Sequence, residues 1–476
     1  MFDVLIIGAG VIGANLLREL SRYQVRAAVL EKENDVGLGA TRANSAIVHA
    51  GYDPEPGTKM ARFNVQGSNM MEQLCRDLSV PYRRNGSMVI AFEPEEEETL
   101  RRLYRQGKEN GVQGLQLLTK QQALEQEPNL NPCLSAALYA PTGAIVSPWE
   151  LTVALCDNAV ENGAQCITGQ AVCSITKKPE GYFVVKTQKG EEYEARFVVN
   201  AAGVYADQIS IMAGSGGFSI HPSKGSYYVL DKSQSSLVRS TVFQCPSKAG
   251  KGVLISPTVH GNLIVGPDAQ EIQDREDTSC QQERLSFVRR TAEKTSAKVD
   301  YRESIRNFAG IRANCDRPDF IVEQSSQVPG FFEASGIKSP GLSASPAIAL
   351  ELVRLLEEAG LPLPLKSDFQ PRRSKIHFKD LPEQEKQLLI RDNPSFGRVI
   401  CRCETVTEGE ILQALASPTC PPTLDGVKRR CNAGLGRCQG GFCGPRICEL
   451  IAKTRGISML QVQKDREGSY LLTREL

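Results

Sequence analysis

Seven of the fifteen cysteines fall within residues 401–448, where four of them form two closely spaced pairs. The pairs are C-x-C at Cys401 and Cys403, and C-x4-C at Cys438 and Cys443. Paired thiolates hold zinc or an iron–sulfur cluster in proteins. Zinc ribbons prefer C-x-x-C, whereas the glycines beside the second pair supply close backbone N–H groups that suit bridging sulfides. The spacing therefore favours a [2Fe–2S] cluster over zinc or no metal. The other three cysteines are expected to be structural: Cys420, Cys431 and Cys448.

A second stretch that could do chemistry runs from Phe2 to Glu31. A short β-branched block predicts a buried parallel strand, and a G-x-G-x-x-G turn follows it. Gly8 permits the tight turn, Gly10 lets the backbone approach a pyrophosphate, and Gly13 lets the next helix pack closely. The N-terminus of that helix can hold phosphates. Glu31 ends the second predicted strand and is placed to bind ribose hydroxyls, so the stretch predicts a dinucleotide site.

The small, polar segment 37–51 follows this unit and is expected to wrap the cofactor. The hydroxyls of Thr41 and Ser45 can reach the phosphates and the isoalloxazine ring of a flavin. His49 is one of only four histidines and stands among small residues. Its position alone leaves a catalytic role and a buried structural role equally open.

Two later stretches are expected to return to the same cofactor. Residues 165–203 predict short strands, a hairpin and a buried strand that runs into a glycine turn at Gly203. A second turn of this kind would lie beside the first, over the same dinucleotide. Residues 331–346 predict a strand and a glycine–proline turn, then a helix over about 345–358 with Pro346 in its first turn. The N-terminus of that helix could stabilise negative charge on a reduced flavin.

Residues 218–320 change character, with alternating, turn-separated segments that predict a sheet and one helical stretch near 281–296. We interpret them as a separate domain that covers the flavin. Its candidate anchors for a polar substrate are Lys224, Arg306, Arg312 and Arg317. Arg312 is favoured because it follows Gly310-Ile311, which is typical of a strand end. Helical spacing also marks residues 60–80, 93–110 and 151–162, and the charges of the second helix indicate a solvated face without function.

Length, charge and hydropathy indicate the number of domains and the cellular location. A chain of 476 residues is too long for one core, so two or three domains are expected. The net charge of +1 gives no support for nucleic-acid binding. The glycine motif begins so early that no room remains for a signal peptide, and no apolar run approaches the ~18 residues of a membrane span. We expect a cytoplasmic protein, with docking to the inner face of the membrane through a partner left open.

Four motifs now identify a family resemblance over the first ~365 residues. They are Gly8–Gly13, Asn44–Gly51, Val199–Gly203 and Gly336–Leu342. These motifs resemble those of the D-amino-acid-oxidase-like FAD enzymes, and residues ~396–450 resemble the bacterioferritin-associated-ferredoxin-like [2Fe–2S] domain. The combination resembles the catalytic subunits of anaerobic glycerol-3-phosphate dehydrogenases. The L-2-hydroxyglutarate dehydrogenases, which share the N-S-x-x-x-H-x-G motif, are the nearest rival family.

The resemblance implies FAD rather than NAD, with His49 as the catalytic base and the two cysteine pairs as cluster ligands. Lys338 departs from the pattern, because this position is commonly acidic in the family; a lysine could strengthen the charge on reduced flavin or bind an anionic substrate. The expected cofactor-binding residues are Gly8, Gly10, Val11, Ile12, Gly13, Glu31, Lys32, Thr41, Asn44, Ser45, Val172, Ala202, Gly203, Gly310, Gly341, Leu342 and Ser343.

The expected fold is α/β, with a Rossmann-like FAD-binding domain, a discontinuous β-rich substrate domain and a small C-terminal iron–sulfur domain. The FAD-binding domain is assigned to residues 1–85, 145–217 and 325–365, and the substrate domain to residues 86–144 and 218–324. The C-terminal part is divided into a linker at 366–395, the [2Fe–2S] domain at 396–455 and a tail at 456–476.

The expected function is oxidation of sn-glycerol 3-phosphate to dihydroxyacetone phosphate, with electrons passing from FAD through the cluster to a partner subunit, a carrier or a quinone-linked membrane partner. His49 would take the hydroxyl proton, while Arg312 and Lys224 would hold the phosphate. Three alternatives stay open. The first is a dehydrogenase of a 2-hydroxy acid such as L-2-hydroxyglutarate, or of a 2-amino acid. The others are a subunit of an amine or imino-acid dehydrogenase, and a flavin and iron–sulfur electron-transfer module without a substrate of its own.

Overall fold

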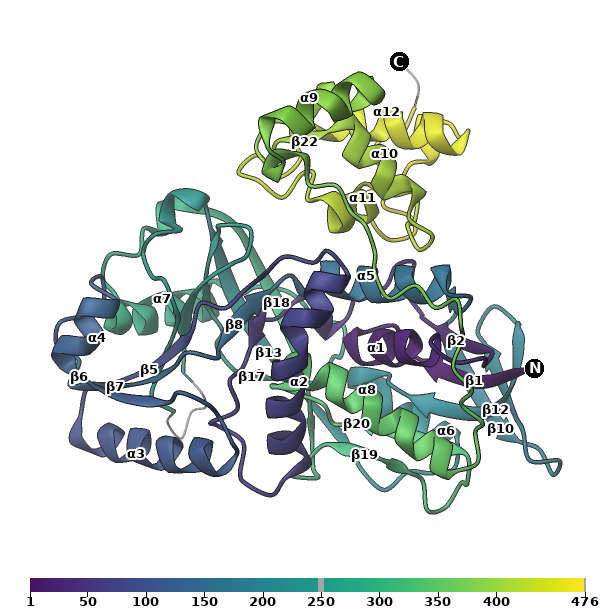
Figure 1. Ribbon diagram of the computed structural model, residues 1–476, viewed down its shortest axis with the longest axis horizontal. Coiled ribbons are helices and arrows are strands. Elements are labelled where there is room, and N and C mark those ends of the chain that lie inside the picture. The colour runs from purple at the N-terminus through teal and green to yellow at the C-terminus, as the bar shows by residue number, and fades with distance from the viewer. Residues whose placement is uncertain (247–251, 475–476) are drawn as a thin grey trace.

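The computed structural model describes residues 1–246 and 252–474 (Figure 1). Two large sheets lie side by side in a broad body. A small, mostly helical unit stands on one side of this body, green to yellow in the ribbon. It begins with α9 (Glu383–Asp392) and is called the C-terminal unit below. The expected α/β class with a Rossmann-like part, a β-rich part and a C-terminal unit is confirmed. The residue bounds of the domains stay a prediction.

The first sheet has eight strands around a parallel centre. The strands are β1 (Phe2–Ile7), β2 (Ala27–Leu30), β9 (Gln165–Ile167), β10 (Val172–Lys177), β11 (Phe183–Thr187), β12 (Glu192–Asn200), β19 (Ile321–Gln324) and β20 (Phe331–Ser335). β1 pairs in parallel with β2 on one side and with β12 on the other. The turns that follow β1 and β12 therefore leave the same edge of the sheet, which is where open α/β sheets bind ligands.

Helices cover both faces of this sheet because the side chains of β1 alternate between two cores. Val4 and Ile6 pack in one core, whereas Leu5 and Ile7 pack in the other. The helices of the first core are α1 (Val11–Leu20), α2 (Lys59–Asp77), α5 (Pro148–Glu161) and α8 (Gly341–Glu358). The opposite face carries α6 (Ala206–Met212), whose Ile209 belongs to the second core.

The second sheet has nine strands and forms the β-rich part. Its strands are β5 (Ser87–Ala91), β6 (Gln116–Thr119), β7 (Ala136–Ala140), β13 (Ile220–Leu230), β14 (Thr241–Gln244), β15 (Leu254–Pro257), β16 (Leu263–Gly266), β17 (Gln270–Glu271) and β18 (Ser304–Cys315). The helices α3 (Pro94–Glu109), α4 (Lys120–Gln126) and α7 (Gln282–Thr295) accompany it. β13 and β18 pair antiparallel along their whole length, and this long ribbon forms one wall of the site described below.

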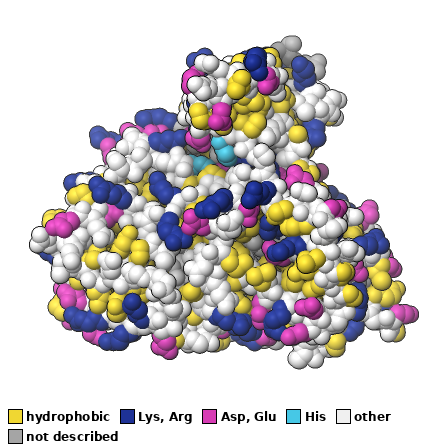
Figure 2. Space-filling view, viewed as in Figure 1, with side chains coloured by type: hydrophobic (Ala, Val, Ile, Leu, Met, Phe, Trp, Pro, Cys, Tyr) yellow, Lys and Arg dark blue, Asp and Glu magenta, His cyan; other side chains and the backbone are white. Residues whose placement is uncertain are grey.

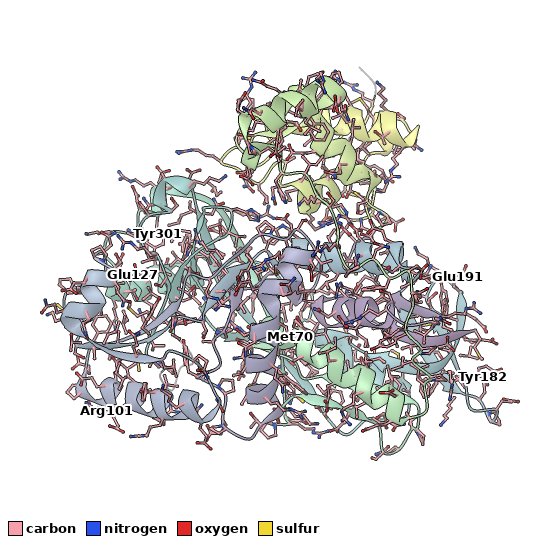
Figure 3. The ribbon with its side chains drawn as sticks, viewed as in Figure 1. Met70, Arg101, Glu127, Tyr182, Glu191 and Tyr301 are labelled. Carbon is pink, nitrogen blue, oxygen red and sulfur yellow. The ribbon has the colours of Figure 1, made fainter. Side chains whose placement is uncertain are left out.

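The helices expected from periodicity near residues 60–80, 93–110, 151–162 and 281–296 are confirmed as α2, α3, α5 and α7. On α3, Arg101 forms ion pairs with Glu97 at 3.2 Å and Glu98 at 3.2 Å. Figure 3 places Arg101 at the outer edge of the molecule. The charges of α3 thus form a solvated face, as the sequence indicates.

A separate three-stranded sheet contains the strand that leads into His49. It consists of β3 (Ile47–Val48), β4 (Tyr82–Arg83) and β8 (Ala144–Val146). β3 pairs with β8 at Ile47 and Val48, directly before His49, and Ile47 lies opposite Ile145. The position of His49 is therefore set by a strand pairing between two distant parts of the chain.

The C-terminal unit has its own hydrophobic core, which includes Ile411, Val427, Ile451 and Val462. Its elements are β21 (Val399–Cys401), β22 (Val406–Thr407), α10 (Glu408–Ala416), α11 (Leu424–Cys431) and α12 (Gly444–Arg455), preceded by α9 (Glu383–Asp392). The side chains of Thr407 and Glu410 form the capping box at the start of α10 that the sequence predicts.

The expected start of the helix at about Ser345 is wrong, because α8 begins at Gly341. Pro346 therefore lies inside the helix rather than in its first turn. Proline has no backbone N–H, so the carbonyl of Leu342 lacks its usual helical donor. The hydroxyl of Ser345 donates to that carbonyl at 2.8 Å, which explains how the helix tolerates the proline.

Candidate functional site

A cavity of about 2190 Å³ lies where the two large sheets and the C-terminal unit meet. It exceeds the ~300–1,000 Å³ of a usual small-ligand site, so it has room for a dinucleotide together with a substrate. In Figure 2 the C-terminal unit stands on the body, and histidine shows on this face only at the junction between them. Of the residues expected to bind cofactor or substrate, those that line the cavity are Gly8, Gly10, Val11, Ile12, Glu31, Lys32, Thr41, Asn44, Ser45, His49, Val172, Ala202, Gly203, Arg306, Gly310, Arg312, Lys338, Gly341 and Leu342. Those that do not are Gly13, Lys224, Arg317 and Ser343.

The glycine turn after β1 needs its glycines for space. Gly8 has a φ of +101°, and a Cβ there would lie 2.5 Å from the carbonyl oxygen of Ala201. A Cβ on Gly13 would lie 2.0 Å from the carbonyl oxygen of Gly8. Gly13 thus serves helix–strand packing and not the cavity surface, which matches its expected role in the motif.

Glu31 presents a buried carboxylate at the edge of the cavity. One carboxylate oxygen accepts the backbone N–H of Ala9 at 2.8 Å, and the other accepts that of Glu33 at 3.0 Å. Burial raises the pKa of Glu31, although these two hydrogen bonds oppose the shift. Each carboxylate oxygen can accept a further hydrogen bond, so the group can bind a pair of ribose hydroxyls.

Next to Glu31, the cavity is lined by Lys32, Tyr205 and Glu276. The ammonium of Lys32 lies 2.5 Å from the Glu276 carboxylate and 4.7 Å from the centroid of the Tyr205 ring. The Tyr205 hydroxyl donates to Glu276. Burial, together with this carboxylate, raises the pKa of Tyr205 to about 12. The positive charge of Lys32 is therefore compensated by the carboxylate of Glu276.

The loop side chains expected to reach the cofactor mostly hold the loop itself. Thr41 Oγ1 accepts the backbone N–H of Val11 at 3.0 Å. The amide of Asn44 donates to the carbonyl of Thr41 at 2.7 Å and accepts the N–H of Ala46 at 2.7 Å. Ser45 Oγ lies 3.1 Å from the hydroxyl of Tyr227 on β13. These contacts fix the loop against α1 and the β-rich part.

His49 is held by the start of α8 and the turn that leads into it, far from His49 in the chain. Its backbone N–H donates to Ser343 Oγ at 2.7 Å, and its Nε2 lies 3.2 Å from Ser339 Oγ. The ring lies 5.9 Å from the ring of Phe243, measured between centroids. Ser343 thus positions the backbone of His49 without lining the cavity. Ser339 is a residue that the sequence reasoning missed, although it stands inside the quoted motif Gly336–Leu342.

Two of the candidate anion anchors already have charge partners. Lys224 is buried and lies 2.6 Å from the Asp277 carboxylate, so its charge is compensated. Arg317 pairs with Glu323 at 2.9 Å and lines a different, smaller cavity. Neither side chain is therefore suited to bind an anion in the large cavity.

Arg306 lines the large cavity but makes its contact with the C-terminal unit. Its Nη1 donates to the side-chain oxygen of Gln439 at 3.3 Å. Gln439 directly follows Cys438, one of the expected cluster ligands. We therefore assign Arg306 to the contact between the β-rich part and the cysteine loop.

Arg312 lines the large cavity, and its Nη2 donates to the carbonyl of Asp268 at 3.0 Å. It forms no ion pair with any residue that the structure describes. The expectation that it stands at a strand end is wrong, because β18 continues to Cys315. Gly310, on the same face of β18, packs against the loop, since a Cβ there would lie 1.8 Å from the carbonyl oxygen of Ala43. The strand therefore directs Arg312 toward the cavity, where no carboxylate among the described residues pairs with it.

The four expected cluster ligands form two pairs. Cys403 Sγ lies 3.6 Å from Cys438 Sγ, and the thiols of Cys401 and Cys443 are hydrogen-bonded to each other. That hydrogen bond lowers the pKa of Cys401 to about 6, against the opposing effect of burial. The backbone N–H of Gly434 also points to Cys401 Sγ at 3.5 Å.

This arrangement of thiols suits a cluster of two irons. A [2Fe–2S] cluster takes two protein ligands on each of its two irons. Two cysteine pairs with a backbone N–H donor beside them fit that requirement.

Two buried polar groups at the cavity surface lack a hydrogen-bond partner in the described residues. Among the described residues, the indole N–H of Trp149 and the hydroxyl of Ser147 are buried without a hydrogen-bond partner, and both residues line the cavity. Buried polar groups are normally satisfied, so these atoms fit a bound cofactor with polar edges such as FAD. Trp149 is not among the expected site residues, although it is the only tryptophan of the chain.

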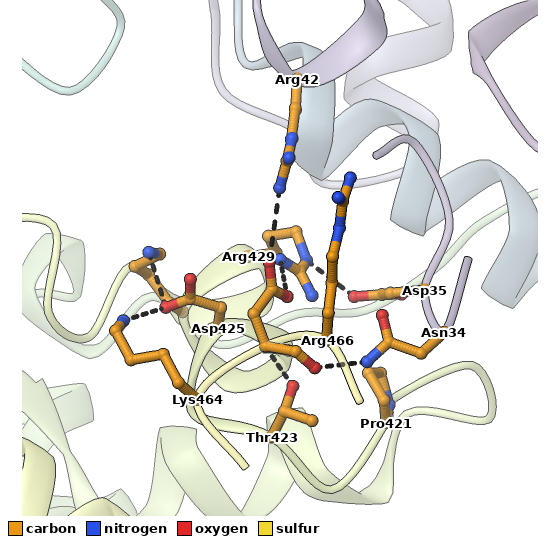
Figure 4. Close-up of polar contacts among 12 residues, drawn as sticks. Asn34, Asp35, Arg42, Pro421, Thr423, Asp425, Arg429, Lys464 and Arg466 are labelled. Atoms are coloured by element: carbon orange, nitrogen blue, oxygen red, sulfur yellow. Dashed lines mark hydrogen bonds and ion pairs between the residues drawn. The ribbon is translucent and has the colours of Figure 1, made fainter. Parts of the chain in front are cut away.

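The C-terminal unit is fastened to the Rossmann-like part by buried charges (Figure 4). The carboxylate of Asp35 accepts from Arg429 Nε at 2.7 Å and from Arg430 Nη1 and Nη2 at 2.9 Å. Burial raises the pKa of Asp35, but the two guanidinium groups outweigh it and hold the value below the usual range. Asp465 bridges Arg429 at 2.9 Å and Arg42 at 3.4 Å. The unit thus closes over the segment that follows Glu31.

Comparison with known families agrees with this geometry. The model for FAD dependent oxidoreductases matches residues 3–355. The chain belongs to this family. The model for the BFD-like [2Fe-2S] binding domain matches residues 399–453. FAD and a [2Fe–2S] cluster are therefore its cofactors, as expected, and the chain is an oxidoreductase.

Three relatives extend the comparison. A glycerol 3-phosphate dehydrogenase from Caloramator mitchellensis is 47% identical over 99% of this chain and 98% of its own. A glycerol 3-phosphate oxidase from Mycoplasma genitalium is 32% identical over 74% of this chain and 94% of its own. The solved structure of L-alpha-glycerophosphate oxidase from Mycoplasma pneumoniae, dithionite-reduced and with FAD bound, has a TM-score of 0.75 and 30% identity, covering 78% of this chain and 98% of that one.

None of the helices in the described residues is both long enough and apolar enough to cross a bilayer.

Proposed function

We propose that this FAD-dependent oxidoreductase oxidises sn-glycerol 3-phosphate at its secondary alcohol to dihydroxyacetone phosphate. The observation that carries the proposal is a cavity that contains His49 and an arginine, Arg312, without a carboxylate partner among the described residues. A relative at 47% identity over nearly the full chain, a glycerol 3-phosphate dehydrogenase, supports the substrate.

His49 is proposed as the base that removes the hydroxyl proton of the substrate. Its Nε2 faces Ser339 Oγ, and its backbone is fixed by Ser343, so the ring is held in one orientation. FAD, when bound, accepts the hydride from the carbon that carries the hydroxyl. An oriented imidazole can then take the proton as the carbonyl forms.

Arg312 is proposed to bind the phosphate of the substrate. A guanidinium group presents a planar set of donors that matches phosphate oxygens. Lys224, the other anchor expected from the sequence, is less suited because Asp277 already neutralises it. Lys338 lines the cavity as well and is the second cation that we propose for the anionic substrate.

The cluster is proposed to pass electrons singly to an acceptor outside the chain. Cys403 is exposed, so the cluster edge that it would hold can be approached by a partner. We propose an electron-accepting partner subunit, with docking at the inner face of the cell membrane when that partner is linked to quinone.

The proposal is tested by anaerobic reduction of the purified holoenzyme. Addition of sn-glycerol 3-phosphate should bleach the flavin absorbance within seconds, whereas L-2-hydroxyglutarate and amino acids should not. Bleaching by the hydroxy acid alone would keep the fold, the cofactor and the base but replace the substrate. Bleaching by none of these compounds would favour a relay module without its own organic substrate.

A further inference from the structure

Glu150 is a buried carboxylate that joins three parts of the chain at one point. Its side chain is 3% exposed and lies on α5 at the junction below the C-terminal unit. Lys375 Nζ, from the segment before α9, lies 2.5 Å from Glu150 Oε2. His260 Nε2, from the β-rich part, lies 3.1 Å from Oε1, and Asn432 Nδ2, from the C-terminal unit, donates to Oε1 at 3.1 Å. None of these four residues has a role in the chemistry proposed above.

The charge of Glu150 is maintained by these neighbours. Burial alone would raise the pKa of Glu150, but the ammonium of Lys375 and the imidazole of His260 hold it well below its usual range. Loss of one partner would leave an uncompensated buried charge, so these contacts of Glu150 are costly to break. Glu150 therefore fixes Asn432 relative to the flavoprotein part.

Toward the cavity, the junction continues through Trp149 and His260. Their rings are stacked with centroids 5.8 Å apart, and both residues line the cavity. Trp149 follows β8 closely in the chain, and Val146 at the end of β8 donates its N–H to the carbonyl of Ala46 beside β3. The junction is thus connected to the strand that leads to His49.

Toward the cluster, the junction continues through the end of α11. Asn432 caps that helix in the left-handed conformation, with φ of +64°. Two residues later the backbone N–H of Gly434 points to Cys401 Sγ at 3.5 Å. We call residues 432–434 the cluster loop. This loop is anchored to Glu150 through Asn432 and to Cys401 through Gly434.

We propose that Glu150, acting through Asn432, is a positioning residue for electron transfer between the flavin and the cluster. It holds the Cys401 side of the cluster loop against the wall formed by Trp149 and His260. With FAD and the cluster bound, the two electrons released by one substrate molecule would pass singly to the cluster, and each would leave it for the external acceptor. No bond forms or breaks at Glu150, and it exchanges no proton. The proposal rests on the proposed electron route and deepens it.

The test compares three variants of the full chain loaded with both cofactors. Glu150→Gln removes the charge, and Asn432→Gly removes the amide while keeping a residue suited to the left-handed conformation. Asp157→Asn is the matched control. Asp157 is also fully buried at the junction, but it binds Arg373 and Ser417 and makes no contact with the cluster loop in the described residues.

The flavin is reduced by a light pulse in the presence of a sacrificial amine donor, and absorbance traces follow reduction of the cluster. Because no glycerol 3-phosphate is used, the result does not depend on the proposed substrate being correct. We expect cluster reduction to slow about tenfold in Glu150→Gln and Asn432→Gly, which corresponds to ~1.4 kcal/mol in the barrier, because the rate of electron transfer falls steeply as donor and acceptor move apart. Asp157→Asn should keep the wild-type rate, because Asp157 contacts Arg373 and Ser417 and not the cluster loop in the described residues.

Iron content and the electron paramagnetic resonance spectrum of the reduced cluster must match the wild type in each variant, which separates mispositioning from cluster loss. Wild-type rates in either Glu150→Gln or Asn432→Gly would overturn the proposal. Equal slowing in Asp157→Asn would also overturn it, because disturbed docking of the C-terminal unit in general would then explain the slower cluster reduction. If Glu150→Gln fails to fold, Asn432→Gly decides the question alone.

Discussion

Ser339 Oγ lies 3.2 Å from Nε2 of His49, although 290 positions separate the two residues in the chain. Four residues after Ser339, Ser343 accepts the backbone N–H of His49 at 2.7 Å. One turn at the start of α8 therefore holds both the ring and the backbone of the proposed base. The contribution of the His49 ring can therefore be tested separately from that of the serines that position it.

Replacement of His49 by Ala should slow flavin reduction by sn-glycerol 3-phosphate by ~10²–10⁴-fold, the usual contribution of a general base. FAD should stay bound, because the residues of the glycine turn and Glu31 are unchanged. Anaerobic stopped-flow absorbance measures the rate. Ser339→Ala should slow the same step by only about tenfold, since one hydrogen bond contributes ~0.5–1.5 kcal/mol. An equal loss in both variants would mean that His49 acts only while Ser339 holds its ring.

Replacement of Arg312 by Ala should raise KM for sn-glycerol 3-phosphate by ~10–100-fold, because a hydrogen bond to a charged group is worth ~1.5–3 kcal/mol. Lys224→Met is the comparison, since Asp277 already compensates that ammonium. Steady-state kinetics of both variants should show a raised KM only for Arg312→Ala. A raised KM in Lys224→Met alone would restore Lys224 as the phosphate ligand.

Replacement of Glu31 by Gln should weaken FAD binding by ~10–100-fold, because the charge-assisted bonds to the ribose are lost. Burial raises the pKa of Glu31, so in the free protein its carboxylate gains a proton at a higher pH than an exposed glutamate, which titrates near ~4.3. The affinity for FAD should therefore begin to fall on acidification above that value. Fluorescence titration of the apoprotein with FAD across pH checks both points, and a pH-independent affinity in the wild type would contradict the second.

Replacement of Asp35 by Asn should destabilise the docked C-terminal unit by ~3–5 kcal/mol, the usual cost of leaving buried charges without their partner. The pKa of Asp35 is lowered in the folded state, so its stabilisation is present above the unfolded value of ~3.9 and is lost as the pH falls from there through the folded pKa. Urea unfolding of the variant, and of the wild type in acid, measures both effects. Asp300→Asn, which breaks the exposed pair with Arg302, should leave the midpoint unchanged.

Replacement of Cys403 by Ala should abolish the [2Fe–2S] cluster, because one iron loses a ligand of the pair with Cys438. Cys431→Ala is the control, since Cys431 is buried in the core of the C-terminal unit and its thiol donates to the carbonyl of Val427. Iron and sulfide analysis with visible absorbance separates the two. Loss of iron in Cys431→Ala with retention in Cys403→Ala would reassign the ligands.

The local elements of this protein follow from the sequence by short-range rules. The turn at Gly8–Gly13 and the carboxylate of Glu31 are recognised because a strand, a tight turn and a helix restrict which residues fit within about thirty positions. The helices near residues 60–80 and 93–110 follow from apolar spacing, which tertiary contacts reinforce. Propensity misplaces the start of α8, because it does not describe how the Ser345 hydroxyl satisfies the carbonyl that Pro346 leaves without a donor.

The sequence by itself determined the cofactors, through motifs whose residues lie close together in the chain. Only the tertiary structure decided which charges are free to act. Lys224 and Arg312 are both candidates in the sequence, but folding brings Asp277 to the first and no described carboxylate to the second. The same holds for Glu150, whose three partners come from distant segments. Charge compensation is a property of neighbours in space, and those neighbours are set by the packing of the sheets and the C-terminal unit.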